Sequence, residues 1–132
     1  MNIEYKDTHV FQPNELQKLF LSVKWESGRH PEKLVIAMEH SDTVFSAWNH
    51  RQLIGLINIL DDGVMTAYIH FLLVDPAYHG MGIGKELLRL TAEKYKDYLR
   101  MVLVSDERET GFYQKSGFEL ATGMSAMFIN RF

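Results

Sequence analysis

The expected fold follows from the stretch Leu72-Leu73-Val74-Asp75-Pro76-Ala77-Tyr78-His79-Gly80-Met81-Gly82-Ile83-Gly84-Lys85-Glu86-Leu87-Leu88. It begins as an apolar strand, which Pro76 ends because proline cannot donate to a sheet ladder. Glycines then alternate at positions 80, 82 and 84, just before a leucine-rich helix. Because no side chains block such a loop, its backbone N–H groups can approach one anion, and the helix N-terminus adds partial positive charge. The stretch therefore predicts a site for a phosphate-bearing ligand.

Two common phosphate-binding motifs do not fit this loop. A dinucleotide fingerprint needs G-x-G-x-x-G after the first strand, but here Gly84 comes one residue early and the strand lies late in the chain. A Walker A loop needs G-x-x-x-x-G-K-[ST], and Gly84-Lys85 supplies its centre. However, His79 replaces its first glycine and Glu86 replaces the hydroxyl that binds magnesium. Both motifs are therefore rejected.

A third motif fits the loop. Residues 74–84 resemble motif A of the GNAT family of acetyl-CoA-dependent N-acetyltransferases, V-x-P-x-x-[RQ]-[RG]-x-G-x-[GA], which a leucine-rich helix follows. One position departs from the pattern, because His79 stands where the family has Arg or Gln. Further on, Gly111-Phe112-Tyr113-Gln114-Lys115-Ser116-Gly117-Phe118 resembles the F-Y-x-x-x-G-F segment of the family's motif B.

The order of the predicted elements matches the same family. The resemblance implies an α/β (α+β) GNAT fold, a mixed central sheet of about six to seven strands flanked by about four helices. Apolar periodicity and turn residues predict the following elements. Strands are expected near residues 3–5 and at 43–48, 53–60, 65–74, 101–104, 118–120 and 126–130. Helices are expected from near Pro13 and near Pro31, and over 84–99 and 110–115.

Composition predicts a single domain over residues 1–132. Its 46% hydrophobic and 23% charged content is ordinary for a globular protein, and its net charge of −3 argues against nucleic-acid binding. No cysteine is present and no two of the six histidines lie within four residues, so no metal site is expected. No apolar run reaches the ~18 residues of a membrane span, and Met1-Asn2-Ile3-Glu4 does not begin a signal peptide. We therefore expect a cytoplasmic protein that contacts no membrane.

The resemblance assigns the cofactor site to the strand end and the loop. In the family, the pantetheine arm of acetyl-CoA adds to the end of the fourth strand as a pseudo-strand. A backbone N–H near Leu73 would stabilise the thioester oxygen, a role worth about 2.7–4 kcal/mol for one donor in a protease. The loop amides would surround the pyrophosphate. The cofactor-binding residues implied are Leu72, Leu73, Val74, His79, Gly80, Met81, Gly82, Ile83, Gly84 and Lys85.

The resemblance also implies the catalytic groups. Tyr113 matches the family's general acid, which protonates the departing CoA thiolate. His70 occupies the place at which some arylalkylamine acetyltransferases carry a histidine, so it is the candidate base, and Glu26, Asp106 and Glu107 are the alternatives. Many members have an asparagine that contacts CoA where this chain has Asp106.

The function implied is direct acetyl transfer from acetyl-CoA to a primary amine: a small amine, an amino-sugar, or a peptide or protein amine. In the family the loop between the first two helices selects the acceptor, and here it contains Trp25, whose ring suits an amine with an apolar body. The alternative is a CoA-binding regulatory or sensor module with the same fold and little catalysis. Residues 126–129 form an apolar edge through which a homodimer is expected.

Overall fold

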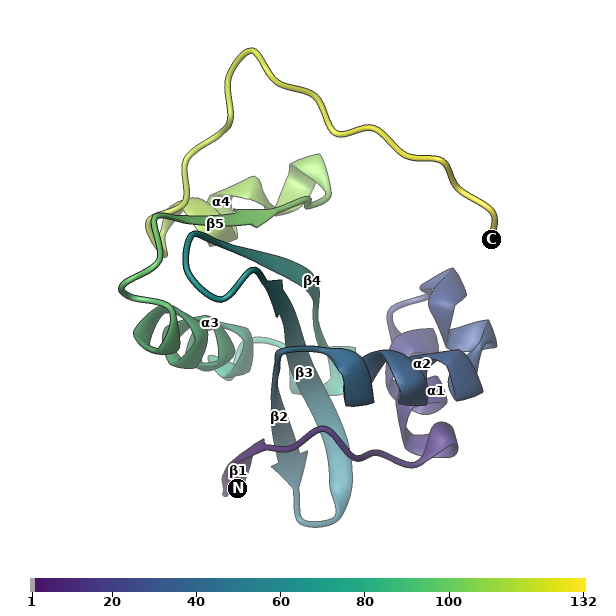
Figure 1. Cartoon of the computed structure of the whole chain (residues 1–132). Helices are drawn as coiled ribbons and strands as arrows, with labels where there is room; N and C mark the ends of the chain where they lie inside the picture. Colours follow the sequence, from purple (N-terminus) through teal and green to yellow (C-terminus); the bar gives the residue numbers. More distant parts are fainter. Residues whose placement is uncertain (1) are drawn as a thin grey trace.

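The computed structural model describes residues 2–132, and it confirms the expected fold class, with a central mixed sheet between helices (Figure 1). The strands are β1 Ile3–Asp7, β2 Thr43–Asn49, β3 Gln52–Asp61, β4 Thr66–Val74 and β5 Arg100–Leu103. The α-helices are α1 Pro13–Ser22, α2 Pro31–His40, α3 Ile83–Lys94 and α4 Thr110–Gln114. Short 3₁₀ turns are η1 Glu26–Arg29, η2 Pro76–Tyr78 and η3 Glu107–Glu109.

The strands lie in the order β1-β2-β3-β4-β5. The first four pair antiparallel, whereas β5 pairs parallel to β4 after the crossover through α3. One irregularity matters for the site: Asn58 opposes Phe71 and Ile59 opposes Ile69, so His70 is an extra residue in β4. Such a β-bulge bends the strand that carries it.

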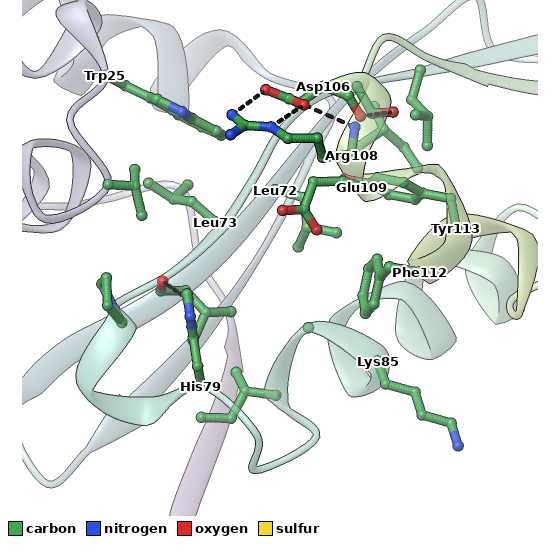
Figure 2. Close-up of a pocket in the computed structure, with 18 of the residues that line it drawn as sticks. Trp25, Leu72, Leu73, His79, Lys85, Asp106, Arg108, Glu109, Phe112 and Tyr113 are labelled. Atoms are coloured by element: carbon green, nitrogen blue, oxygen red, sulfur yellow. Dashed lines mark hydrogen bonds and ion pairs between the residues drawn. The ribbon is translucent and has the colours of Figure 1, made fainter.

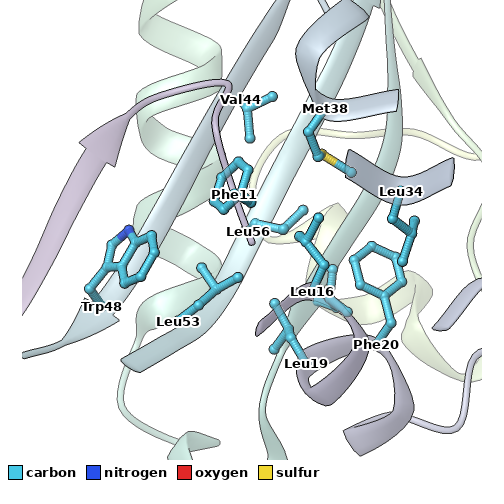
Figure 3. Close-up of a cluster of buried hydrophobic side chains, with 11 residues drawn as sticks. Phe11, Leu16, Leu19, Phe20, Leu34, Met38, Val44, Trp48, Leu53 and Leu56 are labelled. Atoms are coloured by element: carbon cyan, nitrogen blue, oxygen red, sulfur yellow. The ribbon is translucent and has the colours of Figure 1, made fainter. Parts of the chain in front are cut away.

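Helices cover both faces of the sheet, because both faces of its central strands are apolar (Figure 1). On one face, α1 and α2 bury a cluster that includes Leu16, Phe20 and Met38 against Val44 and Leu56 (Figure 3). On the other face, the amphipathic helix α3 packs on the isoleucines of β3 and the start of β4. Each fully buried side chain of this size contributes about 1.5–3 kcal/mol to folding.

The sheet has fewer strands than the six to seven predicted. Residues 118–120 and 126–130 do not form strands, because after Gly117, which has a φ of +95°, the chain leaves the sheet and has no neighbouring strand with which to pair. Helix α3 also ends at Lys94 rather than Leu99. There the Tyr95 hydroxyl is held by Thr43 and Asp61, at 2.6 Å and 2.7 Å.

Candidate active site

β4 has an open edge at its C-terminal half. Its parallel pairing with β5 ends at Ile69, which opposes Leu103, but β4 continues to Val74. Within residues 2–132, the backbone groups beyond Ile69 therefore have no strand partner on this side. An extended ligand can pair with such an edge as an added strand would.

The direction of each backbone group on this half of β4 follows from its hydrogen bonds. The N–H groups of Phe71 and Asp75 donate toward β3, to the Asn58 side chain at 2.9 Å and the Ile54 carbonyl at 2.8 Å. Alternate residues of a strand turn their N–H groups to opposite edges. Those of Leu72 and Val74, on either side of Leu73, therefore face the open edge.

A groove of about 810 Å³ runs along this edge and into the glycine loop (Figure 2). It brings together nearly all the site residues predicted from the sequence. These are His70, Leu72, Leu73, Val74, His79, Gly80, Gly82, Ile83, Gly84, Lys85 and Tyr113. Among the described residues, Met81 is the one predicted cofactor residue whose side chain does not line the groove; it is 47% exposed to solvent instead.

The three glycines of the loop have two different roles. Gly80 and Gly82 have φ angles of +80° and +78°, and a Cβ at either position would meet no protein atom within 4 Å. Both glycines line the groove, so this open space is available to a ligand. A Cβ on Gly84 would instead lie 3.2 Å from the Phe112 ring, so this glycine lets α4 pack closely on the first turn of α3.

His79 turns back toward the strand rather than outward. Its Nε2 lies 2.8 Å from the Val74 carbonyl oxygen, which can only accept, so Nε2 carries the hydrogen. His79 thus ties the loop to the end of β4 and occupies one carbonyl of the open edge. Lys85, at the start of α3, also lines the groove, and Figure 2 shows its ammonium group extending away from the other labelled side chains.

Tyr113 extends from α4 into the groove, packed edge-to-face against Phe112 and Phe118 at ring-centroid distances of 5.1 Å and 5.9 Å. Burial raises the pKa of its phenol above the usual value, and the nearby Glu109 carboxylate raises that pKa further. The phenol therefore keeps its proton at neutral pH, which is the form that a general acid needs.

His70 lies at the bulge and lines the groove, with its ring stacked on Phe71 at 3.9 Å between centroids and near Tyr68 at 5.6 Å. Although the residue as a whole is exposed, partial desolvation of its ring lowers the pKa of the imidazole. A lowered pKa keeps the ring neutral at physiological pH, and a neutral imidazole can accept a proton.

The three alternative bases fit less well. Arg108 holds Asp106 through two side-chain bonds of 3.0 Å and 2.9 Å, and this partner lowers the carboxyl pKa of Asp106 to about 2, too low for a useful base. Neither Glu26 nor Glu107 lines the groove. Glu26 instead faces Arg29, at 3.6 Å.

Sequence reasoning missed three groove residues on η3 and α4: Arg108, Glu109 and Phe112. The sequence could have pointed to Glu109, because it precedes Tyr113 by four residues and one helical turn brings such residues together. Trp25 lines the groove as expected, but Ser27, Arg29 and His30 from the same loop do not.

Two further features are absent from residues 2–132. No group of three or more His, Asp or Glu side chains is arranged to hold a metal ion. In the same part of the chain, none of the helices has the length and apolar content needed to cross a membrane.

Comparisons with known proteins agree with the fold and indicate the family. A ycf52-like N-acetyltransferase of Prochlorococcus marinus is 34% identical over 112 residues, which cover 80% of this chain and 62% of that protein. Serotonin N-acetyltransferase 2, chloroplastic, of Oryza sativa subsp. japonica is 29% identical over 98 residues, 70% of this chain and 49% of that protein. This chain thus spans about half to three fifths of the length of these relatives.

Solved structures show the same architecture over nearly the whole chain. The GNAT family acetyltransferase SP0256 of Streptococcus pneumoniae TIGR4 superposes with a TM-score of 0.84 and 27% identity, covering 98% of this chain and 99% of the other. The sequence profile of the acetyltransferase (GNAT) family matches residues 10–118. On this match and these relatives, the chain belongs to the GNAT acetyltransferase family.

Proposed function

We propose that this chain transfers an acetyl group from acetyl-CoA directly to a primary amine. The observation that carries the proposal is the open edge of β4, which leads from Leu72 into the glycine loop at Gly80–Gly84. A pantetheine arm paired with this edge would bring its pyrophosphate to the loop amides. Tyr113 lines the same groove from α4, on the other side of the open edge.

In the proposed reaction, the amine nitrogen attacks the thioester carbonyl carbon. The N–C bond forms, and negative charge collects on the carbonyl oxygen, where the Leu72 N–H would donate a hydrogen bond. As the C–S bond breaks, the Tyr113 phenol gives its proton to the CoA thiolate. His70 takes the proton that the amine loses, directly or through water.

The groove favours an acceptor with an apolar or aromatic body. Trp25 is 37% exposed and lines the groove, and its ring lies 5.9 Å from that of Phe71, on which His70 also stacks. These rings would hold the body of the acceptor beside the proposed base. Glu109, a carboxylate that lines the same groove, would attract the ammonium form of the acceptor. A relative named for serotonin, an arylalkylamine, is consistent with this choice.

The second candidate is a CoA-binding sensor with little catalysis. Two observations favour it: His79 is bonded to Val74 rather than free to reach a ligand, and Asp106 is paired with Arg108 at the position where the family's asparagine contacts CoA. Both differences from the family pattern affect residues expected to bind CoA. Tyr113 still matches the family's general acid and the edge of β4 is open, so we rank acetyl transfer ahead of the sensor.

Release of free thiol from acetyl-CoA tests the proposal. The panel should contain an arylalkylamine, an amino-sugar, a peptide with a free N-terminus and a lysine peptide. Amine-dependent thiol release, fastest with the arylalkylamine, is the expected result. Binding of acetyl-CoA in calorimetry without thiol release for any amine would favour the sensor, and absence of binding would overturn both candidates.

A further inference from the structure

Lys24, which follows α1, has a backbone conformation in which glycine is the usual residue. The Lys24 N–H donates to the Leu21 carbonyl at 3.0 Å, and the Trp25 N–H donates to the Phe20 carbonyl at 3.2 Å. This pair of bonds is the Schellman ending of a helix, which holds Lys24 in the left-handed region, with a φ of +63°. Because a Cβ is crowded in that conformation, the backbone does not account for a lysine here, and its side chain is the feature to explain.

The same helix ending places Trp25 directly after Lys24. A Schellman ending brings the hydrophobic residue that follows it against one in the last turn of the helix. The Trp25 ring accordingly packs edge-on against Phe20, at 6.0 Å between ring centroids, and it also lies 5.9 Å from the Phe71 ring. Lys24 and Trp25 both line the groove. An aromatic acceptor that contacts Trp25 therefore lies next to a lysine.

Lys24 is the cation of the groove that is open to a ligand. It is exposed to solvent, and within residues 2–132 no carboxylate lies at salt-bridge distance from it. Arg108 and Lys85 also line the groove. However, Arg108 donates two bonds to the Asp106 carboxylate, and Lys85 extends away from the other labelled side chains (Figure 2). This arrangement leaves Lys24 to meet an anionic group on a ligand.

Opposite charges line the groove from two different parts of the chain. Lys24 precedes η1, whereas Glu109 belongs to η3, and Figure 2 shows Trp25 across the groove from Glu109 and Tyr113. A ligand with both an ammonium group and a carboxylate would match this arrangement, with its ammonium toward Glu109 and its carboxylate toward Lys24. Charges of both signs in one groove favour a ligand that carries the complementary pair.

We propose that the acceptor is an aromatic amine that also carries a carboxylate, and that Lys24 binds this carboxylate. The simplest such acceptor is an aromatic α-amino acid. The inference rests on the proposed acetyl transfer and narrows its acceptor class. In the reaction the N–C bond forms and the thioester C–S bond breaks, and the ammonium group loses two protons, one to the CoA thiolate and one to solvent. The carboxylate is unchanged, so the N-acetyl product would also contact Lys24.

Thiol release from acetyl-CoA with matched acceptors tests the role of Lys24. L-Phenylalanine carries the carboxylate, L-phenylalaninamide has nearly the same shape without the negative charge, and phenethylamine lacks the group altogether. Lys24→Asn removes the cation and suits the backbone, because asparagine visits the left-handed region. We expect kcat/KM for phenylalanine, relative to either acceptor without a carboxylate, to fall at least about tenfold in Lys24→Asn, chiefly through KM. Lys24→Arg should retain most of this ratio.

His50→Asn is the matched control for Lys24→Asn. His50 also has a positive φ, +55°, but it lies on the β2–β3 turn and does not line the groove, so the ratio should stay unchanged. A lysine at a helix C-terminus also attracts the last carbonyl groups, and loss of that attraction alone would lower the unfolding midpoint without changing the ratio. An unchanged ratio in Lys24→Asn, with thiol still released by phenethylamine, would overturn the role of Lys24 and leave the proposed transfer standing.

Product binding tests the inference without turnover. N-acetyl-L-phenylalanine and N-acetylphenethylamine are titrated in calorimetry, with CoA present, into the unmodified full chain and into Lys24→Asn. The dissociation constant of N-acetyl-L-phenylalanine should rise at least about tenfold in the variant, and more than that of N-acetylphenethylamine. If no amine releases thiol, the proposed transfer fails, and this measurement still decides the ligand class. Absence of binding, or equal dissociation constants for N-acetyl-L-phenylalanine in the two proteins, would overturn the inference.

Discussion

The side-chain oxygen of Asn58 accepts a hydrogen bond from the backbone N–H of Phe71 at 2.9 Å, at the point where His70 interrupts the pairing of β3 and β4. The Asn58 amide nitrogen donates to the Ser41 hydroxyl at 3.1 Å, and that hydroxyl donates to the Ala37 carbonyl at 2.7 Å. A buried side chain thus replaces the backbone partner that the bulge removes. Since Phe71 precedes Leu72, Asn58 also fixes the direction of the proposed thioester donor.

Asn58→Leu should therefore reduce both stability and turnover. It leaves the Phe71 N–H unpaired, and an unsatisfied buried group costs about 1–3 kcal/mol in the free energy of unfolding. We expect the turnover number to fall by a larger factor than acetyl-CoA affinity, because only the reacting carbonyl depends on the direction of the Leu72 N–H. Urea unfolding, calorimetry and steady-state kinetics measure the three quantities.

The matched control for the Asn58→Leu variant is Ser41→Ala. It removes the far end of the same hydrogen-bond chain but keeps the bond between Asn58 and Phe71. It should lower stability while leaving turnover close to that of the unmodified chain. If both variants lose turnover equally, the loss comes from general destabilisation rather than from the bulge.

Tyr113→Phe should retain acetyl-CoA binding and lose about 10²–10⁴-fold in turnover, the usual contribution of a general acid. The ring keeps its packing against Phe112 and Phe118, so thermal stability should change little. Tyr78→Phe is a suitable control, because Tyr78 also lines the groove but its hydroxyl accepts a hydrogen bond from the Asn49 amide, at 2.9 Å. Unchanged turnover in Tyr113→Phe would remove the phenol from the mechanism.

The sequence predicts features formed by neighbouring residues better than features that depend on contacts between distant segments. The glycine loop and α3 follow from contiguous residues. The open strand edge was implied only by the resemblance, because it depends on where the pairing of β4 with the distant β5 ends. The bulge at His70 depends on pairing with β3, so no local pattern reveals it, and Asn58 looks like a misplaced polar residue in an apolar run. The segment at 126–130 has strand propensity, but a strand also needs a neighbouring strand to pair with, and propensity does not supply one.

The acidic limb of the pH–rate profile should reflect protonation of the His70 imidazole. Its pKa in the folded protein lies below the ordinary 6.5, so the imidazole is neutral and able to accept a proton above that lowered value. The ratio kcat/KM, which depends on protonation of the free enzyme, should therefore fall as the pH decreases through a pKa below 6.5, more steeply than protonation of the acceptor amine alone would cause. The His70→Gln variant should lose this acidic limb and turn over more slowly at pH 7. A limb that persists unchanged in His70→Gln would assign it to another group.

Gly82→Ala, compared with Gly63→Ala, separates backbone strain from ligand contact. Both glycines have positive φ, +78° and +88°, and at both a Cβ would meet no protein atom within 4 Å. An alanine in this conformation costs about 1–2 kcal/mol, so the two variants should lose similar stability in urea unfolding. Only Gly82 lines the groove, where the added methyl would stand between the loop amides and a pyrophosphate. We expect Gly82→Ala to raise the dissociation constant for CoA at least about tenfold, and Gly63→Ala to leave it unchanged. Equal CoA affinity in the two variants would mean that the loop does not hold the pyrophosphate.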